Sequence, residues 1–83
     1  MNGDPFVRYH GGTEVKLGDI VSLDGKRGRV VCVFDEELYA SGYPKADWGH
    51  LGTGVVIDFI GFGPVHYEDG PEDDICFVGR RSR

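Results

Sequence analysis

The apolar positions of the chain fall in short runs separated by polar, glycine-rich segments. The first two runs, 19–23 and 29–34, flank the segment Asp24-Gly25-Lys26-Arg27-Gly28. An Asp-Gly pair followed by a second glycine is a strong hairpin signal, because glycine adopts positive φ without penalty. The second run is rich in β-branched residues, which favour strands. The pattern therefore predicts a hairpin over residues 19–34.

Three further runs have the length of strands, at 54–60, 65–67 and 75–78. Residues 71–74 are typical of a short 3-10 turn, and residues 80–83 are expected to be a frayed tail. The alternating segment Phe6-Val7-Arg8-Tyr9-His10 fits either an extra edge strand of the domain or an arm that reaches a partner, and the pattern leaves both open.

The longest connection, residues 35–54, contains Pro44, which suits the start of a helix, so we predict one helical turn over 44–51. A connection of this length is uncommon without a purpose. No ten-residue stretch has helical periodicity. We therefore predict an all-β domain over residues 1–83, with its core at about 15–79. Its expected architecture is a small five-stranded SH3-like, partly open barrel with one long loop and short 3-10 turns.

Length and composition fit this small domain. The chain has 83 residues, of which 40% are hydrophobic and 28% charged, as in globular proteins. No apolar run approaches the roughly 18 residues that cross a membrane, and the first residues lack a secretory signal, so we expect a cytoplasmic protein. The two cysteines, Cys32 and Cys76, lie in apolar runs and are expected to be reduced and buried.

The segments 17–21 and 24–31 resemble the opening strands of KOW-type and other SH3-like barrels. In order and spacing, residues 17–79 resemble a group of short, stand-alone bacterial proteins with an SH3-like barrel. Some proteins of this kind look like immunity proteins, which protect a bacterium from a secreted toxin. The resemblance rests further on Tyr43-Pro44, Trp48, Leu51, Gly54-Val55, Val65-His66-Tyr67 and Glu72-Asp73-Asp74-Ile75.

Motifs for catalysis and cofactor binding are absent from the sequence. The serines and cysteines lack a recognisable partner base. The cysteines also lie in apolar runs, which disfavour the thiolate form. The histidines and cysteines lack the paired spacing of zinc ligands, and the acidic segment 68–74 lacks the EF-hand order. The glycine-rich segments 49–54 and 61–63 lack a following Gly-Lys-Ser/Thr. We therefore expect no enzyme activity, no metal and no cofactor.

The distribution of charge favours a protein partner. The net charge is −5, yet residues 35–74 hold ten acidic side chains and one basic side chain, Lys45. This acidic excess repels a phosphate backbone and suits a basic protein. Aromatic side chains in and beside the loops add apolar area to a contact surface. Solubility alone also accounts for acidic loops, and Trp48 also fits a role in closing the barrel.

We predict a non-enzymatic, acidic protein-binding module, such as an immunity protein that blocks a toxin enzyme with a basic surface. The expected contact residues are Asp35, Glu36, Glu37, Tyr39, Tyr43 and Asp47 in the long connection, with Glu68, Asp69, Glu72 and Asp73 as a second patch. The alternative is an adaptor or a KOW-like nucleic-acid module that uses Lys26, Arg27, Arg29, Arg80, Arg81 and Arg83. We expect no membrane partner, and a monomer or weak dimer.

Overall fold

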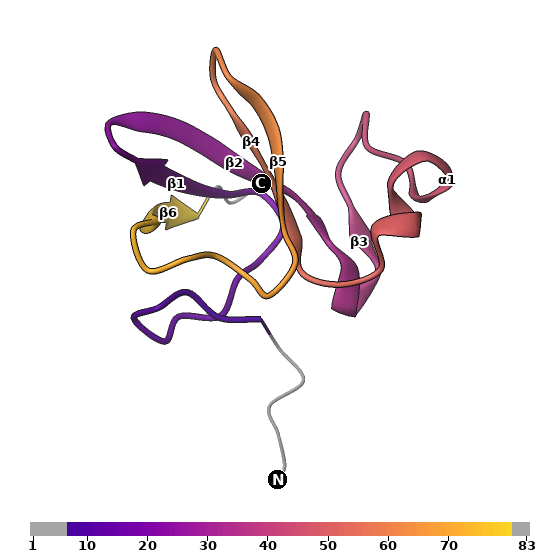
Figure 1. Cartoon of the computed structure of the whole chain (residues 1–83), viewed down its shortest axis with the longest axis horizontal. Helices are drawn as coiled ribbons and strands as arrows, with labels where there is room; N and C mark the ends of the chain where they lie inside the picture. The colour runs from indigo at the N-terminus through magenta and orange to yellow at the C-terminus, as the bar shows by residue number, and fades with distance from the viewer. Residues whose placement is uncertain (1–6, 81–83) are drawn as a thin grey trace, which may run out of the picture.

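The computed structural model describes residues 7–80 (Figure 1). Its elements are β1 (Asp19–Leu23), β2 (Lys26–Val33), η1 (Phe34–Glu36), β3 (Leu38–Tyr39), α1 (Lys45–Trp48), η2 (Gly49–Leu51), β4 (Val55–Phe59), β5 (Gly63–Tyr67) and β6 (Cys76–Arg80). The strands form one antiparallel sheet in the order β5-β4-β2-β1-β6, and β3 pairs with β2. Within residues 7–80 no ladder joins the outer strands β5 and β6, so the sheet is open.

The mainly-β prediction is confirmed, but the sheet has six strands instead of five. The additional strand is the two-residue β3, inside the connection predicted as a long loop. The predicted helical turn is present as α1 followed by η2. The short 3-10 turn predicted at 71–74 is found one residue later, as a single turn over residues 72–75. The Ile75 N–H closes it by donating to the Glu72 carbonyl three residues earlier.

The β1–β2 hairpin has a two-residue turn. Asp24 and Gly25 both have positive φ, 51° and 80°, and this combination matches the right-handed twist of the flanking strands. The ladder therefore begins at once, with Leu23 opposite Lys26. As a result, β2 starts three residues before the predicted Arg29.

The sheet buries apolar side chains on both faces. Alternation along β4 places Val55, Ile57 and Phe59 in one cluster and Val56 in the other. A register shift between Val30 and Cys32 interrupts the alternation of β2. The first cluster contains Tyr9, Val15, Val21, Val30, Val33, Val55, Ile57, Phe59 and Ile75. The second contains Val31, Cys32, Phe34 and Val56.

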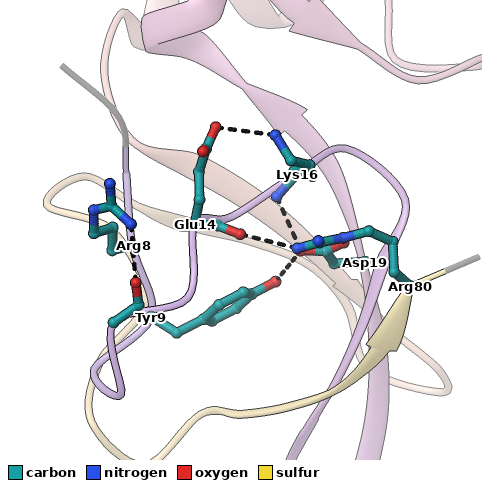
Figure 2. Close-up of polar contacts among 7 residues, drawn as sticks. Arg8, Tyr9, Glu14, Lys16, Asp19 and Arg80 are labelled. Carbon is teal, nitrogen blue, oxygen red and sulfur yellow. Dashed lines mark hydrogen bonds and ion pairs between the residues drawn. The ribbon is translucent and has the colours of Figure 1, made fainter.

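Arg80 belongs to the fold and not to a frayed tail, which corrects the prediction for this residue. Its guanidinium contacts both carboxylate oxygens of the fully buried Asp19, at 2.8 and 3.3 Å, and donates to the Glu14 carbonyl at 3.0 Å (Figure 2). Tyr9 Oη and the Lys16 backbone N–H also donate to Asp19, at 2.8 and 2.9 Å. This network fastens the first described segment to β1 and β6. Residues 81–83 lie outside the described residues.

The described part of the alternating N-terminal segment packs against the core of the domain. Arg8 forms an isolated bridge with Glu14, so the chain turns back on itself before β1. Tyr9 is buried in the first cluster, with its ring 5.2 Å from that of Phe77. Residues 7–15 therefore contribute to the core. Phe6 lies outside the described residues.

The two cysteines differ in exposure. Cys32 is buried in the second cluster, as predicted, and burial raises the pKa of its thiol. Cys76 is exposed, which corrects the prediction. It lies on the outer strand β6, next to Phe77, which is half-buried and packs against the first cluster. Because side chains alternate along a strand, Cys76 and Val78 point away from that cluster.

Candidate functional site

The long connection folds into a layer that covers the second apolar cluster. In Figure 1, β3 and α1 lie together on the side of the sheet away from β1 and β6. Tyr39 packs its ring 5.8 Å from Phe34, and Tyr43 packs 5.5 Å from Trp48. Leu51 packs against the same cluster. Trp48 thus packs over the second cluster.

Tyr39 and Tyr43 are half-buried, so each offers only part of its side chain to a partner. The Tyr43 hydroxyl donates a hydrogen bond to Asp58 on β4. This bond and partial burial raise the pKa of Tyr43, which keeps the phenol neutral and its hydrogen bond intact at physiological pH. Both predicted contact residues therefore have a structural role as well.

The carboxylates predicted on the long connection differ in how they are held. Asp35 is exposed, and its Oδ2 accepts from the Gly54 N–H at 3.3 Å. Glu37 lies 3.1 Å from Lys45 Nζ in an exposed ion pair, and the bond to Glu37 raises the pKa of Lys45. Glu36 is half-buried, and its Oε2 has no hydrogen-bond partner among the described residues. Asp47 is exposed on α1.

The second predicted patch lies along a groove of about 560 Å³ that follows the end of β5. Glu68, Asp69 and Glu72 line it, and none of the three has an ion-pair partner among residues 7–80. Asp73 is exposed but does not line the groove. The groove wall also includes Val65, His66, Tyr67, Gly70 and Pro71.

Charge in this groove affects its tyrosine. Burial raises the pKa of Tyr67, and the negative charges of Glu72 and Asp74 raise it further. The Tyr67 hydroxyl, like an ordinary phenol, is neutral at physiological pH and able to donate a hydrogen bond, and the raised pKa extends this to higher pH. The groove combines acidic side chains, an aromatic ring and a proline, a mixture that accommodates a basic side chain with an apolar stem.

The two predicted patches meet at Thr53 and Gly54. The Gly54 N–H donates to Asp35, and Thr53 Oγ1 donates to the Glu68 carbonyl at 3.4 Å. Gly54 has a φ of 84°, and a Cβ at this position would lie 2.0 Å from the carbonyl oxygen of Tyr67. Glycine is thus required where η1 approaches the end of β5. Residues 35 and 68 are consequently connected through the adjacent residues Thr53 and Gly54.

His66 joins the same two segments and was not among the predicted site residues. Its Nε2 lies 2.8 Å from the Thr53 carbonyl oxygen, and its ring stands edge-on to Phe34, 5.5 Å between centroids. The alternation of the short run 65–67 was the available signal. It places His66 on the opposite face of β5 from Val65 and Tyr67, and so toward the second cluster.

Comparison with known proteins identifies no relative of this chain. No protein-family model, no curated protein and no solved structure matches it. Within residues 7–80, no three histidine, cysteine or acidic side chains gather in the manner of a metal site. The same residues contain no helix long and apolar enough to cross a membrane.

Proposed function

We propose that this chain is a protein-binding module that docks on a basic protein through its acidic surface. The observation that carries the proposal is the groove at the end of β5, lined by three carboxylates without an ion-pair partner among residues 7–80. Such carboxylates suit an incoming arginine, whose guanidinium binds them in bidentate fashion and stacks on an aromatic ring. Tyr67 and Pro71 supply the apolar wall beside them.

The first patch extends this docking surface. Asp35 and Glu68 are linked through the adjacent residues Gly54 and Thr53, so the long connection approaches the end of β5. A continuous negative surface raises the association rate with a basic partner and suppresses wrong partners. Asp47 and Glu36 enlarge the surface, whereas Glu37 is partly neutralised by Lys45.

The more specific proposal is an immunity protein with an SH3-like barrel that neutralises a cognate toxin by direct binding. Its support is the resemblance of residues 17–79 to small bacterial proteins of that kind, together with the open six-stranded sheet. A toxin that acts on nucleic acid carries a basic cleft, and an acidic inhibitor would occupy it. This mode of action requires binding alone, without covalent chemistry.

The alternative is a nucleic-acid module that uses the β1–β2 hairpin. Lys26, Arg27 and Arg29 are exposed along β2, which favours this alternative. Arg80 counts against it, because the guanidinium is engaged by Asp19. The two functions respond differently to nuclease, since a phosphate-dependent complex disappears when the nucleic acid is degraded.

Affinity capture from the native cell lysate, with and without nuclease, tests the proposal. The variant Glu68→Gln/Asp69→Asn/Glu72→Gln removes the groove charges, and Glu14→Gln is the matched control outside both patches. We expect one basic protein at near one-to-one ratio with the wild type and the control, in both lysates. We expect recovery at least about tenfold lower with the triple variant. Equal recovery by the triple variant, or loss of the protein after nuclease treatment, contradicts the proposal.

A further inference from the structure

A second groove lies between the β1–β2 hairpin and β5, where the first apolar cluster reaches the surface. It has a volume of about 280 Å³ and is lined by the apolar side chains Leu23, Phe59, Phe62, Val65 and Tyr67. Leu23, Val65 and Tyr67 are half-buried and pack against the first cluster, while Phe59 is part of it. The groove is therefore a place where the core is accessible between the β1–β2 hairpin and β5.

The turn between β4 and β5 carries two exposed large apolar side chains, of which Phe62 lines this groove. Ile60 is 76% exposed and Phe62 is 68% exposed, the two highest values among the large apolar residues that the structure describes. The turn itself is hydrogen-bonded, because the Ile60 N–H donates to the Arg27 carbonyl and the Phe62 N–H to the Phe59 carbonyl. A well-formed turn thus holds exposed apolar side chains next to an apolar groove, a combination that marks an interaction surface.

The charged residues of the groove suit a second copy of the same chain. Asp24 and Lys26 line it beside the apolar side chains, so it carries one charge of each sign. A two-fold interface presents the same patch on both subunits and must complement itself. Rotation by 180° can bring Asp24 of one copy to Lys26 of the other, with both pairs made at once. The groove at the end of β5 is lined by carboxylates without a lysine or arginine, so two copies would repel each other there.

Strand pairing is a poor way to cover this side of the molecule. β5 is an outer strand, and its second residue, Pro64, has no N–H to donate to an added strand. Contact through side chains in the groove avoids this obstacle. We therefore propose that two copies form a weak two-fold dimer, in which Phe62 of each copy packs into the groove of the other and Asp24 pairs with Lys26 across the axis. The dimer does not depend on the proposed binding function.

Sedimentation equilibrium of the purified chain tests the dimer over roughly 0.02–1 mM protein, the range expected for a small interface. Phe62→Ser removes the inserted ring. Lys26→Glu sets like charges against each other in the two-fold arrangement. Val78→Ser, on β6 outside the groove, is the control because Val78 is also an exposed apolar residue. Denaturant midpoints verify that each variant is folded.

We expect a monomer–dimer equilibrium that Phe62→Ser and Lys26→Glu each weaken at least about tenfold, and that Val78→Ser leaves unchanged. The effect of Lys26→Glu should shrink at about 0.5 M salt, whereas that of Phe62→Ser should persist. A wild-type chain that stays monomeric across the range overturns the proposal. So does growth beyond a dimer, which indicates a head-to-tail contact, or a dimer that is insensitive to both variants.

Discussion

Replacing Arg80 with alanine removes the side chain that connects β6 to the buried carboxylate of β1. The change deletes two contacts with Asp19 and the bond to the Glu14 carbonyl. It also deletes the packing of the guanidinium over the Phe77 ring, 5.2 Å from its centroid. Asp19 would keep the Tyr9 hydroxyl and the Lys16 N–H as donors, but its charge would lose the only cation it contacts within residues 7–80.

The expected loss follows from the burial of the two partners. Breaking a buried ion pair by removing one side costs about 3–5 kcal/mol. Arg80 is 39% exposed, whereas Asp19 is 0% exposed, so part of the interaction is screened by water. With two remaining donors on Asp19, we expect a loss of about 2–3 kcal/mol. A chain of 83 residues has a total stability of about 4–12 kcal/mol, so this is a large fraction.

Urea denaturation followed by tryptophan fluorescence and circular dichroism measures the loss, and a thermal midpoint about 8–20 °C lower should accompany it. Arg80→Lys keeps the charge without the planar fork and should lie between wild type and alanine. Lys16→Ala is the control, because it breaks an exposed ion pair with Glu14 and retains the backbone donor to Asp19. It should change stability by less than about 1 kcal/mol. If Arg80→Ala proves no more destabilising than Lys16→Ala, the ion pair does not fasten β6 to the domain.

Two other predictions concern single residues. Burial and the hydrogen bond to Asp19 raise the pKa of Tyr9 above its ordinary 10.0, so the native phenol stays neutral where the unfolded chain ionises. This contribution to stability is complete below pH 10 and declines above it. Urea denaturation at pH 8 and pH 11 measures how much free energy of unfolding is lost between the two, and Tyr9→Phe should make that loss smaller by about 1.4 kcal/mol. An equal loss in both proteins would contradict the raised pKa of Tyr9. Gly54→Ala forces a Cβ against the Tyr67 carbonyl at positive φ, so its free energy of unfolding in urea should fall by at least about 2 kcal/mol. A free energy of unfolding equal to that of wild type would refute the close approach.

Local features of the fold could be predicted from the sequence. The β1–β2 hairpin follows from Asp24 and Gly25, because their positive φ values are a property of the turn itself. The helical turn after Pro44 is equally local. The start of β2 was placed too late, since the glycine-rich segment was assigned entirely to the turn although pairing begins at Lys26.

Features that depend on distant partners could not be predicted. In the sequence, Arg80 looks like part of a basic tail. Its partner, Asp19, lies 61 positions away in the chain, so no local pattern indicates the ion pair. Cys76 sits in an apolar run, and only the position of β6 at the outer edge of the sheet shows that it is exposed. The strand β3 has two residues, too few for any periodic pattern.

The candidate site was predicted from composition, and its contact residues stay a prediction. The acidic excess of residues 35–74 identified both patches but carried no information on their distance from each other. The structure adds that Asp35 and Glu68 bond to adjacent residues, Asp35 to Gly54 and Glu68 to Thr53. This proximity depends on how β4 pairs with β5, which no local pattern specifies.

Strand β2 has a further consequence for how the molecule opens. It forms ladders with β1, β3 and β4 and contributes side chains to both apolar clusters. Neither cluster can be dismantled completely while β2 holds its place. The backbone amides of Val30 to Val33 should therefore exchange with deuterium only when the entire domain unfolds, so that two clusters behave as one cooperative unit. The outer strand β5, which borders both grooves, can detach and reclose without that event.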